Sequence, residues 1–117
     1  MDKNELKDVL KQHDLWLRSF RLEGRKAILR CANLQDAILQ CANLQDANLD
    51  YSCLPLWCGS LSAHFDDRQI IQFIYHATRA GISSKNTSED IKAELKRLIP
   101  LANKFHRVSE CGFIEEA

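Results

Sequence analysis

A five-residue period dominates the middle of this chain. The stretch "CANLQDAILQCANLQDANLD", residues 31–50, repeats ten residues almost unchanged. An amphipathic helix needs a period of about 3.6 residues and a half-buried strand a period of about two, so this segment matches neither. One leucine recurs in every unit, with a small residue two positions before it. The leucines are Leu29, Leu34, Leu39, Leu44, Leu49 and Leu54, and the small residues are Ala27, Ala32, Ala37, Ala42, Ala47 and Ser52.

One large and one small inward residue per unit suit a narrow coil whose axis the leucines fill. The units "CANLQ DAILQ CANLQ DANLD YSCLP" resemble the pentapeptide-repeat family, whose pattern is A-(D/N)-L-x-x. The resemblance implies a right-handed quadrilateral β-solenoid with one unit per side and twenty residues per coil. Residues twenty apart are then expected to stack, as Leu29 under Leu49, and residues ten apart to lie on opposite sides. Thirty residues form one and a half coils, whose ends need caps.

The flanking segments predict those caps. The N-terminal residues 4–13 read as a short helix with Leu6, Val9, Leu10 and His13 on one face. A second helix is expected to start at Asp66 or Asp67, with Ile70, Ile71, Ile74 and Ala77 on its apolar side, and to stop at Gly81. A third helix is expected to start at Thr87 or Ser88 and to be bent or interrupted at Pro100.

The predicted fold class is therefore mainly β plus α, a short β-solenoid capped by an N-terminal helix and a C-terminal helical pair. The predicted divisions are 1–24 for the N-terminal helix and cap, 25–58 for the solenoid and 59–117 for the C-terminal helical cap. The order of motifs, ending in "LANKFHRVSECG", also resembles small pentapeptide-repeat proteins of phages and prophages.

Charge and composition exclude some function classes. Sixteen basic and sixteen acidic residues cancel, so no overall field favours nucleic acid or a membrane. The polar N-terminus has no apolar run long enough for a signal peptide, which predicts a cytoplasmic protein with no membrane partner. Five cysteines in such a compartment are expected to be reduced.

Two cysteine-containing pairs raise the hypothesis of a structural zinc site. Cys53 and Cys58 are five residues apart, as are His106 and Cys111, so the four residues form a site if the C-terminal tail folds back. Both pairs adjoin apolar residues, and buried reduced cysteines are the favoured interpretation. No cofactor is expected.

No set of residues predicts an enzyme. A nucleophilic site needs a thiol or hydroxyl beside an oriented base. Cys31 and Cys41 have no histidine near them in sequence, and the four histidines are scattered. The chain is interpreted as non-enzymatic.

A basic stretch, residues 18–30, suggests an alternative function, the direct binding of nucleic acid or nucleotides. It holds Arg18, Arg21, Arg25, Lys26 and Arg30 against the single acid Glu23. Such a cluster suits phosphate contacts, although a solvated face is the more common reason for one.

The lead functional hypothesis is a protein-binding inhibitor carried by a phage or other mobile element. The pentapeptide-repeat resemblance suggests DNA mimicry, because some family members resemble a duplex and bind DNA gyrase. Here the repeat has about six units rather than a long rod, and Asp36 and Asp46 are expected to face opposite directions, so no acidic stripe is predicted. An acid-only middle, with Asp36, Asp46 and Asp50, still suits a protein partner.

The partner is expected to be a host nucleic-acid-handling complex such as a CRISPR effector, which an anti-CRISPR-like protein would block by mimicry or by occlusion. Trp57 is a candidate anchor for this interface. A structural, self-associating module is the other alternative, and the chain is expected to be a monomer or a homodimer.

Overall fold

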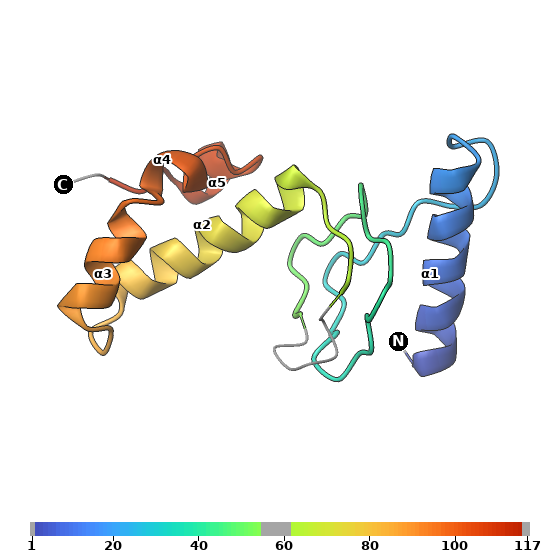
Figure 1. Cartoon of the computed structure of the whole chain (residues 1–117), viewed down its shortest axis with the longest axis horizontal. Coiled ribbons are helices and arrows are strands. Elements are labelled where there is room, and N and C mark those ends of the chain that lie inside the picture. Colours follow the sequence, from blue (N-terminus) through green and yellow to red (C-terminus); the bar gives the residue numbers. More distant parts are fainter. Residues whose placement is uncertain (1, 55–61, 116–117) are drawn as a thin grey trace. The chain divides into compact units, whose positions relative to one another are not determined.

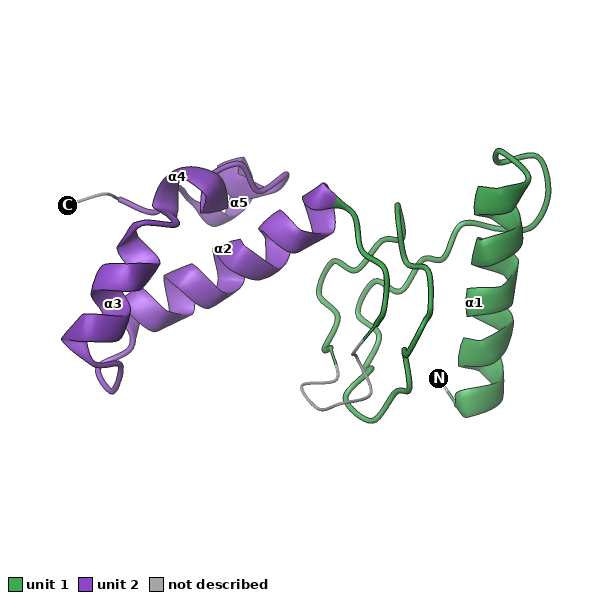
Figure 2. Cartoon of the chain, viewed as in Figure 1, with its two compact units in different colours: residues 1–66 green, residues 67–117 purple. Residues whose placement is uncertain are grey.

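The computed structural model describes residues 2–54 and 62–115. The chain divides into two compact units, residues 1–66 and residues 67–117 (Figure 2). The first unit holds helix α1 (Lys3–Arg18) and the repeat, and the second holds four helices (Figure 1). Each unit is described by itself. The prediction that the second unit caps the repeat stays a prediction.

Helix α1 begins at a capped end and extends further than the sequence predicted. The Asp2 carboxylate accepts a hydrogen bond from the Glu5 amide at 2.8 Å and so satisfies one free amide of the first turn. The helix continues past residue 13 to Arg18. It stops because Phe20 and Arg21 adopt left-handed φ angles of 55° and 71°, before the chain reaches Gly24.

The repeat buries its leucines as predicted. The side chains of Leu29, Leu34, Leu39, Leu44 and Leu49 are all buried. Of the small residues, Ala27 and Ala47 are buried as well, and the remaining described ones are half-buried. These five leucines therefore fill the axis of the coiled segment. We call this segment, residues 26–54, the repeat coil.

Residues about twenty apart lie side by side in the repeat coil. Parallel bridges join Ile28 to Asn48 and Asn33 to Cys53, each with an offset of twenty residues. Backbone hydrogen bonds run in both directions along the first pair, from the Leu29 amide to the Asn48 carbonyl and from the Asn48 amide to the Ala27 carbonyl. The stacking expected from the repeat is confirmed at these positions.

The predicted fold class, mainly β with a β-solenoid, is wrong. Over residues 2–54 and 62–115 the structure has isolated bridges and no strand, and it is 46% helix against 6% in strand-like pairing. The corners explain the difference. Cys31, Cys41, Asp46 and Tyr51, each two residues after a leucine, have φ angles of 61–64°, which breaks the extended conformation at these four corners.

In the second unit, α2 (Asp67–Ser83) packs against α3 (Glu89–Lys96) and α4 (Ile99–Ala102), and α5 (Val108–Cys111) follows (Figure 1). Tyr75, Ala102 and Phe105 form the core, and the Tyr75 and Phe105 rings stack with centroids 4.6 Å apart. The tail is fastened to this core, because Asn103 exchanges two hydrogen bonds with the backbone of Ile114.

The predicted apolar side of α2 was only partly right. Ile71 and Ile74 pack against the core, but Ile70 is exposed and Ala77 also faces outward. The buried positions include Tyr75 and Thr78, a polar pair that a hydrophobicity pattern passes over.

Three further features of the helical unit were predicted, and two of them are confirmed. Gly81 does not stop α2, which continues to Ser83. Ser88 caps α3, as one of the two expected residues, by accepting a hydrogen bond from the Ile91 amide. The expected interruption near Pro100 is confirmed, because α3 ends at Lys96 and Pro100 stands in the first turn of α4.

Candidate functional site

The three acids proposed for partner binding do not form one surface. Asp36 is exposed beside α1, whereas Asp46 pairs with Arg21 at 3.5 Å. Asp50 is only 9% exposed, so its side chain offers little area to a partner. The acid-only middle of the sequence therefore gives no continuous acidic face in the structure.

The basic stretch is largely engaged within the protein. Arg18 pairs with Asp14 at 2.8 Å, and Arg25 lies 3.8 Å from Asp8. Besides its pair with Asp46, Arg21 places its guanidinium 5.1 Å from the centre of the Trp16 ring. Lys26 is exposed. These ion pairs reduce the local positive charge and favour the solvated-face interpretation over phosphate binding.

The proposed zinc ligands are divided between the two units. Cys53 belongs to the first unit, and His106 and Cys111 belong to the second. Cys58 and the candidate anchor Trp57 lie outside the described residues. Within residues 2–54 and 62–115, no group of three or more His, Cys, Asp or Glu side chains is placed to hold a metal ion.

The cysteine prediction was half right. The four described cysteines, Cys31, Cys41, Cys53 and Cys111, are free thiols, as expected for reduced residues. All four are exposed, so the expectation that they pack as buried apolar side chains is wrong for them. The left-handed corners explain two cases, because a corner directs the side chain of Cys31 or Cys41 outward.

A surface that the sequence analysis missed lies along one side of the repeat coil. We call Ile28, Arg30 and Tyr51 the repeat patch. Ile28 is 60% exposed and Tyr51 65% exposed, and the Arg30 guanidinium stacks 5.1 Å from the centre of the Tyr51 ring. The segments that carry them run side by side, since the Cys31 amide donates to the Asp50 carbonyl at 2.9 Å.

Ile28 and Ile38 depart from the asparagine that precedes three of the repeat leucines. The side-chain oxygen of each asparagine accepts a hydrogen bond from the backbone amide two residues later. The pairs are Asn33 with Gln35, Asn43 with Gln45 and Asn48 with Asp50. Isoleucine at positions 28 and 38 cannot make this bond and is exposed instead. This departure from asparagine is the signal in the sequence that could have identified Ile28 and Ile38 as exposed apolar residues.

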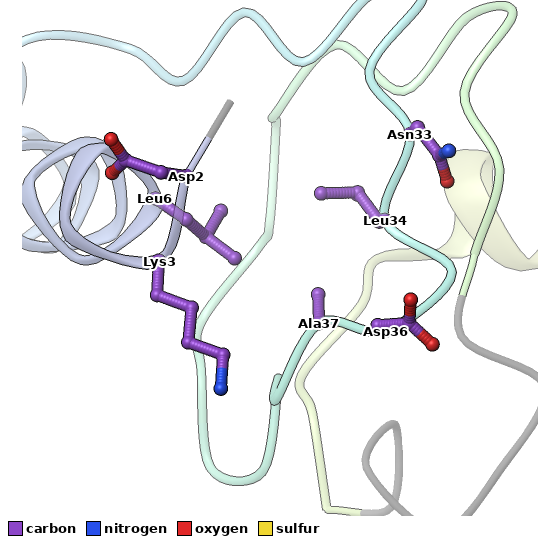
Figure 3. Close-up of a pocket in the computed structure, with 7 residues that line it drawn as sticks. All are labelled: Asp2, Lys3, Leu6, Asn33, Leu34, Asp36 and Ala37. Atoms are coloured by element: carbon purple, nitrogen blue, oxygen red, sulfur yellow. The ribbon is translucent and has the colours of Figure 1, made fainter.

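A pocket of about 190 Å³ opens between the start of α1 and the repeat coil, both in the first unit. Its lining residues are Asp2, Lys3, Leu6, Asn33, Leu34, Asp36 and Ala37. Leu6 and Leu34 point toward each other across it, the Ala37 methyl points into it, and Asp36 points outward at its edge (Figure 3). The lining of the pocket is thus mixed, with three apolar side chains and four polar or charged ones.

Comparison with known families identifies the repeat coil. The family model described as pentapeptide repeats matches residues 26–54, in 8 copies. This segment is therefore a pentapeptide-repeat segment, and the resemblance of the repeat to that family is confirmed. No curated protein and no solved structure matches the chain. None of the helices in the described ranges is long and apolar enough to cross a membrane.

Proposed function

We propose that this protein acts without catalysis, by binding another protein through the repeat patch. The observation that carries the proposal is the stacked pair of Arg30 and Tyr51 beside the exposed Ile28. Tyrosine and arginine are enriched among the residues that dominate binding energy at protein interfaces. A guanidinium stacked on a ring is also held in place before a partner arrives, which lowers the entropy cost of binding.

The cost of these residues to the fold supports the same proposal. Tyr51 occupies a left-handed corner with φ of 61°, where a bulky side chain is disfavoured. Ile28 stands where asparagine would add a side-chain hydrogen bond, as Asn48 does beside it. Both residues are exposed, so burial gives neither of them a compensating gain. Two exposed residues that are unfavourable to the fold are consistent with a role in binding.

We further propose a host nucleic-acid-handling complex, such as a CRISPR effector, as the first class of partner to test. The motive is the resemblance to phage pentapeptide-repeat proteins. Occlusion of the partner's surface fits this protein better than DNA mimicry, because Asp46 is paired and Asp50 is buried. The proposed compartment is the cytoplasm.

The proposal is tested by affinity capture of the tagged full chain from a bacterial lysate, with and without nuclease. We expect a defined protein or complex that stays bound after nuclease treatment and at about 0.5 M salt, where exposed charge contacts are largely screened. Recovery of nucleic acid alone, lost at that salt concentration, would overturn the proposal in favour of direct binding through the basic stretch.

A further inference from the structure

A short loop at the end of α1 displays two large apolar side chains. We call residues 19–24 the Phe20 loop. Within it, Phe20 is 87% exposed and Leu22 is 86% exposed. Their high exposure does not come with a loose backbone. The Arg21 amide donates to the Trp16 carbonyl at 2.7 Å, and the Glu23 amide donates to the Ser19 hydroxyl at 2.9 Å.

The conformation of Phe20 indicates a role beyond folding. Its φ of 55° lies in the left-handed region, which glycine and asparagine adopt far more readily than an aromatic residue. The ring is exposed, so burial does not offset the unfavourable backbone. An outlier of this kind, held by its surroundings, points to function.

The same unit contains a pocket suited to that ring. The pocket of about 190 Å³ has Leu6, Leu34 and Ala37 inside it. An enclosed apolar cavity of about 150 Å³ holds benzene, so this open pocket with a mixed lining is large enough by volume for one phenyl ring. Figure 3 shows the two leucines pointing toward the space that such a ring would fill.

The charges around the loop and the pocket are complementary. Arg18, Arg21 and Arg25 surround the Phe20 loop in sequence, and each side chain is at least 67% exposed despite its ion pair. The pocket rim carries two carboxylates, Asp2 and Asp36, and one ammonium group. The arginines keep their own carboxylate partners, so attraction to the carboxylate rim adds only a small contribution to the contact.

We propose that the chain self-associates by inserting Phe20 of one copy into the pocket of a second copy. The loop and the pocket lie at opposite ends of α1, whose sixteen residues span about 24 Å. The loop therefore cannot reach the pocket of its own chain, and the contact must form between chains. A reciprocal contact gives a closed dimer, and a one-way contact gives longer chains.

The test measures the mass of the purified full chain by sedimentation over a range of concentrations. Wild type is expected to form a dimer or a larger assembly. A Phe20→Asn variant, whose new residue suits the left-handed backbone, is expected to be monomeric and no less stable. Ala37→Met fills the pocket from a half-buried position and is expected to be monomeric too.

A mixture gives the decisive result. Phe20→Asn keeps the pocket and Ala37→Met keeps the loop, so the two monomeric variants are expected to form a 1:1 complex when mixed. If Ala37→Met does not fold, Asp36→Lys replaces it and is expected to weaken association about tenfold by reversing a rim charge. Phe113→Asn removes an exposed aromatic residue of the second unit and serves as the control.

The proposal is overturned if wild type stays monomeric at its highest soluble concentration, or if Phe20→Asn associates like wild type. A mixture of the two monomeric variants that forms no complex would overturn it as well. The self-association proposal does not rest on the repeat patch. An Ile28→Asn/Tyr51→Asn variant is therefore expected to associate like wild type.

Discussion

His13 joins α1 to the first coil of the repeat through both nitrogens of its ring. Its Nδ1 atom accepts a hydrogen bond from the Ala27 amide at 2.9 Å, so Nε2 carries the proton and donates it to the Gln45 carbonyl at 2.7 Å. The side chain is fully buried and stacks on Trp16. A histidine held in this way is a structural residue, and its sequence position on the apolar face of a helix gave no indication of the two bonds.

The first prediction concerns this contact. His13→Ala is expected to lower the free energy of unfolding by about 3 kcal/mol, because it removes the partner of a buried amide and of a partly buried carbonyl and opens a cavity. Urea unfolding measures the change. His106→Ala, which removes an exposed imidazole from the second unit, is the control and is expected to cost less than about 1 kcal/mol. Equal effects of the two variants would contradict the assignment.

The second prediction concerns the left-handed corners of the repeat coil. Cys41 has a φ of 61° and an exposed side chain, so Cys41→Asn is expected to raise the free energy of unfolding by about 1 kcal/mol. Cys41→Val is expected to lower it by a similar amount, since a β-branched residue fits this region poorly. Asp36 occupies the equivalent corner without a positive φ, and Asp36→Val is expected to be much milder.

The third prediction compares two glycines. A methyl group at Gly24 would lie 2.4 Å from the Gln12 carbonyl oxygen, and φ is +72° there, so Gly24→Ala is expected to cost about 3 kcal/mol. At Gly81 the nearest atom belongs to the flexible end of the Leu95 side chain. Gly81→Ala is therefore expected to cost about 1 kcal/mol or less, helped by the higher helix propensity of alanine. Thermal unfolding of both variants checks the order, and the reverse order would refute it.

The fourth prediction concerns Thr78, whose hydroxyl is fully buried and has no hydrogen-bond partner. Thr78→Val keeps the shape and removes the unsatisfied oxygen, so it is expected to raise the free energy of unfolding by about 1 kcal/mol. Thr78→Ser keeps the hydroxyl and loses a methyl group, and it is expected to be destabilising. A destabilised Thr78→Val protein would mean that the hydroxyl has a partner after all.

The parts of the fold that the sequence predicted are those with a periodic signal. The five-residue spacing of the leucines identified the core of the repeat coil, and a twenty-residue offset correctly paired Ile28 with Asn48. The same spacing led to an overestimate of β structure. A side of five residues with a left-handed corner, such as Cys31, leaves room for one bridge at a time rather than a strand.

The candidate sites were harder to predict because they depend on contacts between distant residues. Arg21 looked free in the basic stretch, but its partner Asp46 lies 25 positions later in the sequence. Asp50 looked exposed from its charge, yet the structure buries it. The stacking of Arg30 on Tyr51 likewise joins two residues that are distant in the sequence, so no local sequence pattern indicates it.

Protein binding through the repeat patch is the proposed function of this chain. The most direct measurement is quantitative capture from a nuclease-treated lysate with two full-chain baits, wild type and the Ile28→Asn/Tyr51→Asn variant, with Ile38→Asn as a matched control. Ile28→Asn introduces the asparagine that precedes three other leucines, and Tyr51→Asn places asparagine at a left-handed backbone position. The double variant is therefore expected to be at least as stable as wild type. We expect at least one protein to be enriched about tenfold or more on wild type and on the control relative to the variant. Equal capture of every protein by all three baits would contradict the claim.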